Sequence, residues 1–265
     1  MLTVGLIGGG GMSQDVASII ASSFATDVSI VARLTRAAVP PTNSAPGVDV
    51  ATLDALLARR PQIVVELASQ QAVRQYGADI LAQGVDLLVV STGALTEPVV
   101  LDGLRSAAYA SGARLMIPAG AIGGLDVVGA LKIGGLREVL YRSRKPPRAW
   151  KGTPAEEMLN LDTLDSPTAF FSGTAREAAA RFPQNANVAA TIALAGLGFD
   201  RTRVELVADP HRMTNQHEIE AEGDIGRTMF IIESKPSASN PKTSALTAYS
   251  VVRALLNAQA TFVVQ

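Results

Sequence analysis

The sequence contains no cysteine and only two histidines, His211 and His217. The absence of cysteine excludes disulfides, thiolate zinc sites and cysteine nucleophiles, and two histidines are too few for a multi-histidine site, so we expect no metal. Basic residues number 23 and acidic residues 24, which is not the basic excess typical of nucleic-acid-binding proteins. No run of 18 apolar residues is present. The expected partner is therefore a small molecule, not a nucleic acid or a membrane.

The segment from Met1 to Gly11 has no basic residue and runs directly into four glycines, unlike a signal peptide. We therefore expect a soluble, cytoplasmic protein. Hydrophobic residues make up 48% of the 265 positions and charged residues 18%, which is enough apolar material for a core and excludes a disordered chain. At about 150 residues per domain, this length predicts two domains or one large one.

The first part of the chain alternates between short apolar runs and segments with helical periodicity. Strands are predicted at residues 3–7, 28–32, 63–67, 85–90 and 114–117. Helices are predicted between them, at residues 13–24, 51–58, 71–82 and 97–109. Apolar strands separated by amphipathic helices predict a parallel sheet covered on both faces, and hence an α/β fold with a Rossmann-type, doubly wound sheet.

The pattern changes after Pro118. Strands are predicted at residues 139–143, 168–171, 203–208, 213–221, 228–234 and 261–264, and helices at 188–197 and 244–257, with a loop at 144–165. Strands without intervening helices are typical of a second, α+β domain. We predict a dinucleotide-binding domain at 1–117, completed by 240–265, and a substrate-binding domain at 118–239. Too few helices are predicted to cover its sheet, so this domain is also expected to form a homodimer.

A glycine-rich loop follows the first predicted strand. Gly8 and Gly10 occupy the first two glycine positions of the G-x-G-x-x-G fingerprint, and Ser13 occupies the third. Gly11 and Met12 then begin a predicted helix, whose free N–H groups suit a pyrophosphate. The alternative is a glycine-rich loop without a ligand, but the strand–loop–helix context favours dinucleotide binding.

The end of the second predicted strand carries no carboxylate that would select NAD through the ribose 2′-hydroxyl. Arg33 and Arg36 stand there instead, and either suits the 2′-phosphate of NADP. Two solvated arginines are an equally good interpretation, so NAD or NADP is expected.

His217 lies in a segment of period-2 alternation. Met213, Asn215, His217, Ile219 and Ala221 share one predicted face, and the opposite face carries acidic residues. His217 is thus either an acid/base residue in a cleft or an ordinary core histidine. His211 follows Asp209 and Pro210 in a predicted turn and is expected to be solvated.

Three further segments are typical of ligand sites. Asn185 and Asn187 precede the alanine-rich helix, where they either cap it or, for Asn187, bind the carboxamide of a nicotinamide. Residues 118–126 form a glycine-rich junction at the predicted domain boundary. Residues 240–244 begin the last helix with cap residues and Lys242, as a plain cap or an anion-facing helix end.

These motifs together resemble the L-aspartate dehydrogenase family over nearly the whole chain. The resemblance rests on residues 7–10, 91–95, 118–123, 185–191, 217–220 and 240–244. It implies that His217 is the catalytic histidine and that Ala121 and Asn187 contact the nicotinamide cofactor. It also implies oxidation of L-aspartate to iminoaspartate with NAD or NADP. The imine then hydrolyses to oxaloacetate and ammonia or supplies NAD biosynthesis.

Such a reaction needs a group to accept the ammonium proton or to activate water, and a histidine with a pKa near neutrality suits both tasks. A dicarboxylate substrate also needs cations, for which the candidates are Arg142, Arg144, Lys145 and Lys242. Two alternatives stay open. One is a reductase like dihydrodipicolinate reductase or homoserine dehydrogenase, and the other is a non-catalytic dinucleotide sensor.

Overall fold

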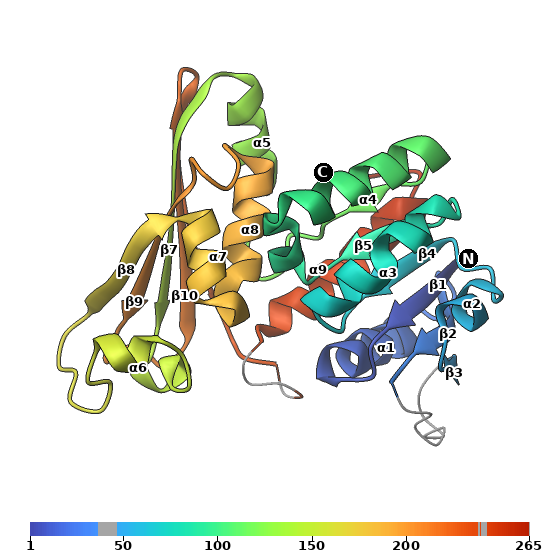
Figure 1. Ribbon diagram of the computed structural model, residues 1–265, viewed down its shortest axis with the longest axis horizontal. Coiled ribbons are helices and arrows are strands. Elements are labelled where there is room, and N and C mark those ends of the chain that lie inside the picture. Colours follow the sequence, from blue (N-terminus) through green and yellow to red (C-terminus); the bar gives the residue numbers. More distant parts are fainter. Residues whose placement is uncertain (37–46, 238, 240–242, 265) are drawn as a thin grey trace. The chain divides into compact units, whose positions relative to one another are not determined.

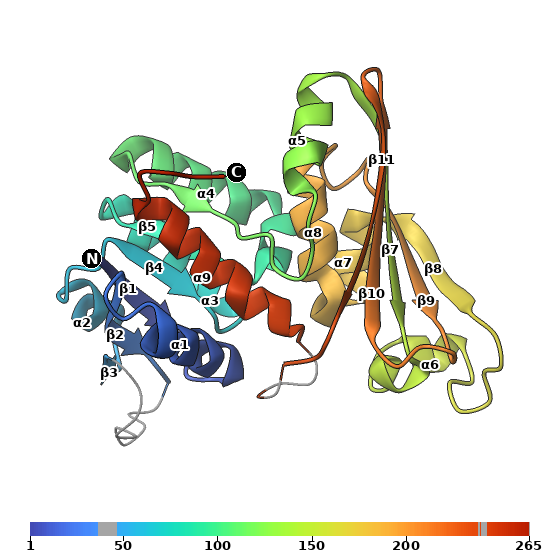
Figure 2. The ribbon, with the colours of Figure 1, turned by 180° about the vertical axis from the view of Figure 1, so that it is seen from behind.

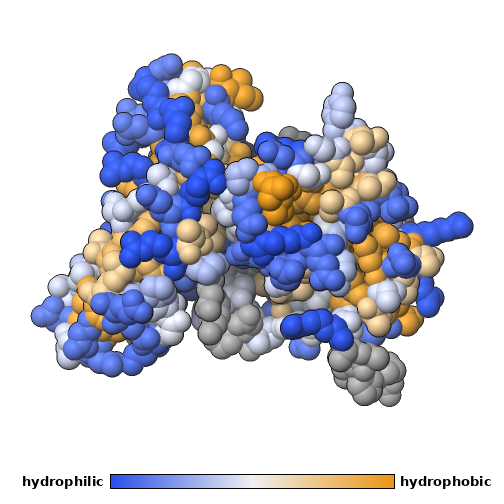
Figure 3. Space-filling model, viewed as in Figure 1, coloured by the Kyte–Doolittle hydropathy of each residue, from blue (hydrophilic) through white to orange (hydrophobic). Residues whose placement is uncertain are grey.

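The computed structural model describes residues 1–36, 47–237, 239 and 243–264. The chain divides into two compact units (Figure 1). The first comprises Met1–Gly120 and Thr247–Gln265, and the second comprises Ala121–Leu246. Within the described residues, no helix is long and apolar enough to cross a membrane, and the surface in Figure 3 mixes hydrophilic and hydrophobic residues.

The first unit contains a six-stranded sheet in which every adjacent pair is parallel. Its order is β3-β2-β1-β4-β5-β6, typical of a doubly wound fold. The strands are β1 (Leu2–Ile7), β2 (Val28–Leu34), β3 (Val48–Val50), β4 (Ile63–Glu66), β5 (Asp86–Val89) and β6 (Leu115–Met116). The predicted Rossmann-type sheet is confirmed, with β3 as a strand that the sequence analysis missed.

Helices cover both faces of this sheet (Figures 1 and 2). α1 (Gly11–Ser23) and α9 (Ala245–Gln259) bury apolar residues against β1, β2 and β4 on one face. α2 (Leu53–Leu57), α3 (Gln70–Ala82) and α4 (Pro98–Ser111) lie on the other, with the 3₁₀ turn η1 (Thr92–Thr96) before α4. The strand predicted at 261–264 is wrong. Phe262 and Val264 are 84% and 66% exposed, so these apolar residues have no sheet to join.

The second unit contains a mixed five-stranded sheet of order β11-β10-β7-β9-β8. β7 and β9 are parallel, and the other adjacent pairs are antiparallel. The strands are β7 (Leu136–Lys145), β8 (Thr168–Thr174), β9 (Arg203–Ala208), β10 (Asn215–Gly223) and β11 (Gly226–Ser234). The expected α+β character of this region is confirmed.

Helices α5 (Leu125–Ile133), α7 (Ala175–Arg181) and α8 (Ala186–Ala195) lie on one face of this sheet (Figures 1 and 2). Neither α5 nor α7 was predicted from the sequence. A capping box of Thr174 and Glu177 marks the start of α7, and the two residues stand three apart in the sequence. The loop predicted at 144–165 is wrong at two short segments, which form η2 (Pro147–Trp150) and α6 (Ala155–Met158). A further 3₁₀ turn, η3 (Pro183–Asn185), precedes α8.

Candidate functional site

The glycine-rich loop connects β1 to α1 in a conformation that requires glycine. Gly8 has φ +114°, and a Cβ at this position would lie 3.1 Å from the Leu67 carbonyl oxygen and from the Ala68 Cβ. Gly10 is the N-cap of α1. The N–H groups of Gly11 and Met12 open the helix and have no intrahelical acceptor, so this end of α1 suits a phosphate.

A cleft of about 480 Å³ opens beside this loop within the first unit. It lies at the carboxyl ends of β1, β2 and β4, where ligands bind in doubly wound sheets. The loop glycines line it together with Leu34, Thr35, Arg36, Ala51, Leu67, Ala68, Ser69, Gln71, Ala72, Gln75 and Tyr76. The glycines allow a ligand to approach the loop backbone closely, and the first N–H groups of α1 are free to donate. Both features fit the pyrophosphate of a dinucleotide.

Glu66 fixes one wall of the cleft, and the sequence analysis did not single it out. The side chain is buried, and it accepts hydrogen bonds from the backbone of Ala68 (2.8 Å), Ser69 (2.7 Å) and Ser91 (2.9 Å), and from the Ser91 hydroxyl (3.0 Å). Burial raises the pKa of Glu66 more than these bonds lower it. The sequence could have indicated this role, because Glu66 is a carboxylate within the otherwise apolar strand predicted at 63–67.

The structure separates the two arginines proposed for the 2′-phosphate. Arg33 is buried and forms a bidentate ion pair with Asp49 of β3, at 2.6 Å and 3.0 Å. It does not line the cleft, whereas Arg36 does. Arg33 is therefore not placed to bind a phosphate in this cleft, and of the two arginines only Arg36 lines it. Ser13 is buried, and its hydroxyl has no hydrogen-bond partner among the described residues.

His217 lies on β10, opposite Ser143 of β7. The predicted alternation is confirmed from His217 to Ala221, since His217, Ile219 and Ala221 are buried while Glu218 and Glu220 face the other side with partial exposure. It is wrong at Met213, which precedes β10 and is 72% exposed. The Nδ1 atom of His217 lies 2.8 Å from the hydroxyl oxygen of Tyr141, and the two rings are stacked with centroids 5.9 Å apart.

The protonation states in this pair follow from burial. Burial, together with the charge of Lys145, lowers the pKa of His217 to about 3, so the expected near-neutral pKa is wrong. Burial also raises the pKa of Tyr141, only partly offset by a hydrogen bond from Ser143. In the tautomer in which the protonated phenol donates to Nδ1, the neutral imidazole carries its own proton on Nε2.

Lys145 is the last residue of β7 and shares the face of His217 and Tyr141. Its Nζ donates to Asn185 Oδ1 at 2.5 Å and lies 4.8 Å from the centroid of the Trp150 ring. Burial lowers the pKa of Lys145 to about 8. Asn185 occupies the N-cap position of α8 without capping it through its side chain, and binds this ammonium group instead.

The remaining predicted site residues of the second unit lie in several places. Ala121 is buried in the segment before α5, and Asn187 is exposed in the first turn of α8. Lys242, proposed for substrate binding, lies outside the described residues. Arg142 and Arg144 alternate with Tyr141, Ser143 and Lys145 along β7 and therefore lie on the opposite face from His217. The interpretation of Arg142 as a substrate ligand beside His217 is corrected on this ground.

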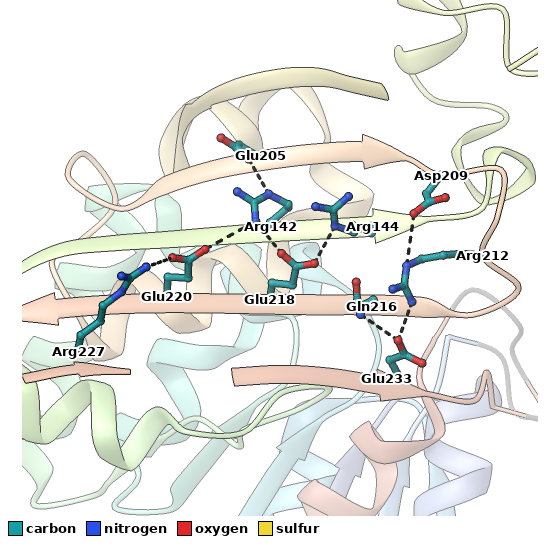
Figure 4. Close-up of polar contacts among 10 residues, drawn as sticks. All are labelled: Arg142, Arg144, Glu205, Asp209, Arg212, Gln216, Glu218, Glu220, Arg227 and Glu233. Carbon is teal, nitrogen blue, oxygen red and sulfur yellow. Dashed lines mark hydrogen bonds and ion pairs between the residues drawn. The ribbon is translucent and has the colours of Figure 1, made fainter. Parts of the chain in front are cut away.

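That opposite face carries a network of ion pairs (Figure 4). Arg142 binds Glu205 at 2.7 Å and Glu218 at 2.6 Å, and Arg144 binds the other oxygen of Glu218 at 2.7 Å. Burial acts to raise the pKa of Glu218, but the hydrogen bonds from both arginines outweigh it and hold the pKa below its ordinary value. The guanidinium groups of β7 thus have carboxylate partners already.

A Rossmann-type unit with a phosphate-binding loop, in one chain with a unit that carries a buried histidine and a partly buried lysine, defines a nicotinamide-dinucleotide-dependent oxidoreductase. The comparisons with known proteins specify the family. Residues 126–258 match the model of the aspartate dehydrogenase C-terminal domain, and residues 8–118 match that of the NAD-binding domain of homoserine dehydrogenase. The chain belongs to the L-aspartate dehydrogenase family.

Individual relatives agree over the full length. The chain is 48% identical to an L-aspartate dehydrogenase of Ralstonia nicotianae and 47% identical to one of Cupriavidus necator, in each case over 97% of both chains. The crystal structure of aspartate dehydrogenase from Thermotoga maritima matches with a TM-score of 0.79 and 30% identity, over 100% of both chains. The likeness therefore includes both units.

Proposed function

We propose that this protein oxidises L-aspartate to iminoaspartate with NAD or NADP. The observation that carries the proposal is the neutral His217–Tyr141 pair beside Lys145, on the helix-covered face of a sheet in a chain of this family. The imine then hydrolyses to oxaloacetate and ammonia or supplies NAD biosynthesis in the cytoplasm.

The residues that hold the cofactor follow from the loop geometry and from the family resemblance. Gly8, Gly10, Gly11 and Met12 bind the pyrophosphate through backbone N–H groups. Ala121 and Asn187 contact the nicotinamide. The cofactor, when bound, supplies a hydride acceptor.

On the substrate side, His217 presents a donor at Nε2 to a substrate oxygen, and Lys145 provides a cation on the same face. The absence of a competing carboxylate at Lys145 among the described residues supports its part in recognising a dicarboxylate. Lys242 stays a further candidate for the same task.

Both NAD and NADP are expected to serve as cofactors. Arg36 lines the cleft and suits the 2′-phosphate of NADP. The nearby carboxylate of Asp49 is paired with Arg33, so its charge is compensated and does not repel that phosphate. Arg36→Ala should weaken NADP binding by about tenfold through loss of one phosphate contact and leave NAD binding unchanged. Equal loss for both cofactors, measured by fluorescence titration of NADPH and NADH, would contradict this assignment.

A homodimer is supported by the sheet face opposite α5, α7 and α8. Met229 and Ile231 of β11 are 54% and 57% exposed there, beside the ion-pair network. We propose that a second copy packs on this face. Light scattering at micromolar concentration should give the dimer mass, and a monomer would contradict this proposal.

The function is tested by following NAD and NADP reduction across a panel of L-amino acids. L-aspartate alone should give turnover at low concentration. Turnover with homoserine, or reduction of dihydrodipicolinate, would indicate one of the related reductases. Cofactor binding without turnover of any substrate would indicate a non-catalytic sensor.

A further inference from the structure

We propose that Lys145, and not His217, accepts the proton that the substrate ammonium group must lose before hydride transfer. This inference rests on the proposed function. His217 then acts as a neutral hydrogen-bond donor, and Asn185 acts as the positioning residue that aims the lysine.

The chemistry requires such an acceptor. The ammonium form of L-aspartate has no lone pair on nitrogen, so the Cα–H bond cannot leave with its two electrons until the nitrogen loses a proton. The neutral Lys145 amine takes that proton and becomes an ammonium group. The nitrogen lone pair would then form the C=N bond as hydride leaves Cα, and the nicotinamide cofactor, when bound, would supply the two-electron acceptor for that hydride. The protonated imine is the product.

The contacts of Lys145 favour a base over a permanent ion pair. An amide oxygen and an indole ring hold its Nζ, at 2.5 Å and 4.8 Å. Neither partner is an anion, so neither fixes the proton on the lysine. Arg142, three residues earlier on the same strand, lies between two carboxylates instead. Burial without a counter-ion disfavours the ammonium form and brings the pKa of Lys145 to about 8.

His217 is poorly suited to the same task. Its Nδ1 lies 2.8 Å from the Tyr141 hydroxyl oxygen, and when that hydroxyl donates, Nε2 carries the proton of the neutral imidazole. The pKa of His217, about 3, makes the imidazole a weak base at neutral pH. A neutral imidazole with a fixed tautomer is instead a good donor to a substrate oxygen.

Among the described residues, the ionisable groups on the neighbouring strands form no ion pair with Lys145 that would raise its pKa. β10 contributes His217, and β9 places Ala208 opposite the lysine. The next residue, Asp209, directs its carboxylate to the backbone N–H of His211 at 3.0 Å and lies 3.5 Å from Arg212 Nε. Tyr141 is protonated, so none of these neighbours forms an ion pair with Lys145.

The charged residues of the covering segments have other partners or are exposed. Arg176 binds Asp200, Lys151 binds Asp162, and Glu177 accepts a hydrogen bond from the backbone N–H of Thr174. The guanidinium group of Arg181 lies over the rings of Phe171 and Phe182, and that of Arg148 donates to the Met213 carbonyl oxygen. Asp126 and Lys132 are exposed. Lys145 is therefore the group of this cluster whose protonation changes near pH 8.

The competing role is that Lys145 merely binds a substrate carboxylate. Arginine separates the two roles, because it keeps the charge but does not lose its proton. With Lys145→Arg, a carboxylate-binding role predicts a KM change with kcat within threefold of the wild type. Our proposal predicts a kcat loss of roughly 10²–10⁴-fold. Lys132→Arg, at an exposed position of α5, is the matched control and should leave kcat unchanged.

Three further readouts do not depend on one variant folding well. Wild-type kcat/KM for L-aspartate should rise with pH to a plateau, with an apparent pKa near 8. Lys145→Ala should lose that rise and regain activity when methylamine is added. Asn185→Asp, which sets a carboxylate beside the lysine, should move the rise to higher pH while keeping the plateau.

NMR of protein labelled at lysine Cε resolves the titration directly, since the chain has five lysines. One signal, absent from Lys145→Arg, should titrate near pH 8. The inference is overturned if Lys145→Arg keeps the wild-type kcat and pH profile, if Asn185→Asp leaves the profile in place, or if no lysine titrates below pH 9. A wild-type enzyme that fails to oxidise L-aspartate overturns the proposed function itself.

Discussion

The two faces of the five-stranded sheet are built from alternate residues of the same strands, yet their ionisable groups differ. In the part of the chain that the structure describes, those on one face lack ionic partners, and those on the other form ion pairs. On one face, Tyr141 and His217 are buried and Lys145 is partly buried, none of the three has a carboxylate partner among the described residues, and their pKa values move toward the uncharged forms. On the other, Arg142 and Glu218 are paired, and the pKa of Glu218 is held low. Because side chains alternate between the two faces of a strand, groups without an ionic partner and groups in ion pairs lie one residue apart in the sequence.

The difference teaches where chemistry is possible on this sheet. An ion pair fixes both protons, so its members neither accept nor release one near neutrality. A buried amine or imidazole without a counter-ion keeps a proton affinity that can match the reaction. We therefore place the reaction on the helix-covered face and a structural role on the charged face.

The largest expected effect comes from removing the donor on the neutral face. His217→Ala should lower kcat by roughly 10²–10⁴-fold while cofactor affinity stays near the wild-type value. His217→Gln, whose amide nitrogen reaches the position of Nε2, should retain more activity than His217→Asn, whose amide reaches only the position of Nδ1.

Steady-state kinetics, NADPH binding and melting temperature of the three variants provide the check. If His217 is a proton acceptor, neither amide replaces it and both variants are as slow as alanine. If it is an ordinary core histidine, His217→Asn keeps a near-normal kcat and only the melting temperature falls.

The second effect is on stability at acid pH. The pKa of His217 is about 3 in the folded protein and about 6.5 in an unfolded chain. As the pH falls from 6.5 toward 3, the unfolded chain binds a proton that the folded protein does not, so stability is lost over this window and is fully present above it. The slope is at most about 1.4 kcal/mol per pH unit.

Comparing the urea unfolding of the wild type with that of His217→Gln between pH 5 and 7 isolates this histidine, because the raised pKa of Glu66 contributes equally to both proteins and the low pKa of Glu218 moves its contribution below pH 4.5. For Glu218 the stability is present above its ordinary pKa and is lost as the pH falls through the lowered one. The difference in unfolding free energy between wild type and His217→Gln should therefore shrink as the pH falls. A constant difference would mean that His217 titrates normally.

Much of the fold follows from the sequence because it depends on local pattern. The apolar runs and the glycine-rich segment predicted the parallel sheet and the loop after β1, and alternation alone placed His217 on the face opposite Glu218. β3 was missed because it has only three residues, and its absence hid Asp49 as the partner of Arg33. A predicted strand of 139–143 also left Lys145 in a loop, whereas β7 continues to that residue.

The contacts that define the candidate site are not local and were not predictable in this way. Tyr141 and His217 are 76 residues apart and meet only because β7 pairs with β10. Asn185 matches a helix cap in sequence, yet its side chain binds Lys145 from 40 residues away. The low pKa of His217 follows from this burial, which alternation alone does not reveal, so the expectation of a near-neutral pKa was wrong.

The smallest effect tests the charged face and completes the comparison. Glu218→Gln removes the carboxylate shared by Arg142 and Arg144, both at 2.6–2.7 Å, and should cost about 1–3 kcal/mol of unfolding free energy. Glu222→Gln is the matched control on the same strand and face. Its side chain is 49% exposed, and its partners Arg137 and Arg227 lie at 3.7 Å and 4.0 Å, so the loss there should stay below about 0.5 kcal/mol. Because Glu218 faces away from His217, kcat at saturating substrate should stay within twofold of the wild type in both variants. Unfolding at one fixed protein concentration and kinetics on the same samples separate the two quantities. A tenfold loss of kcat in Glu218→Gln, with folding intact, would show that the charged face takes part in the reaction and that the division between the faces is wrong.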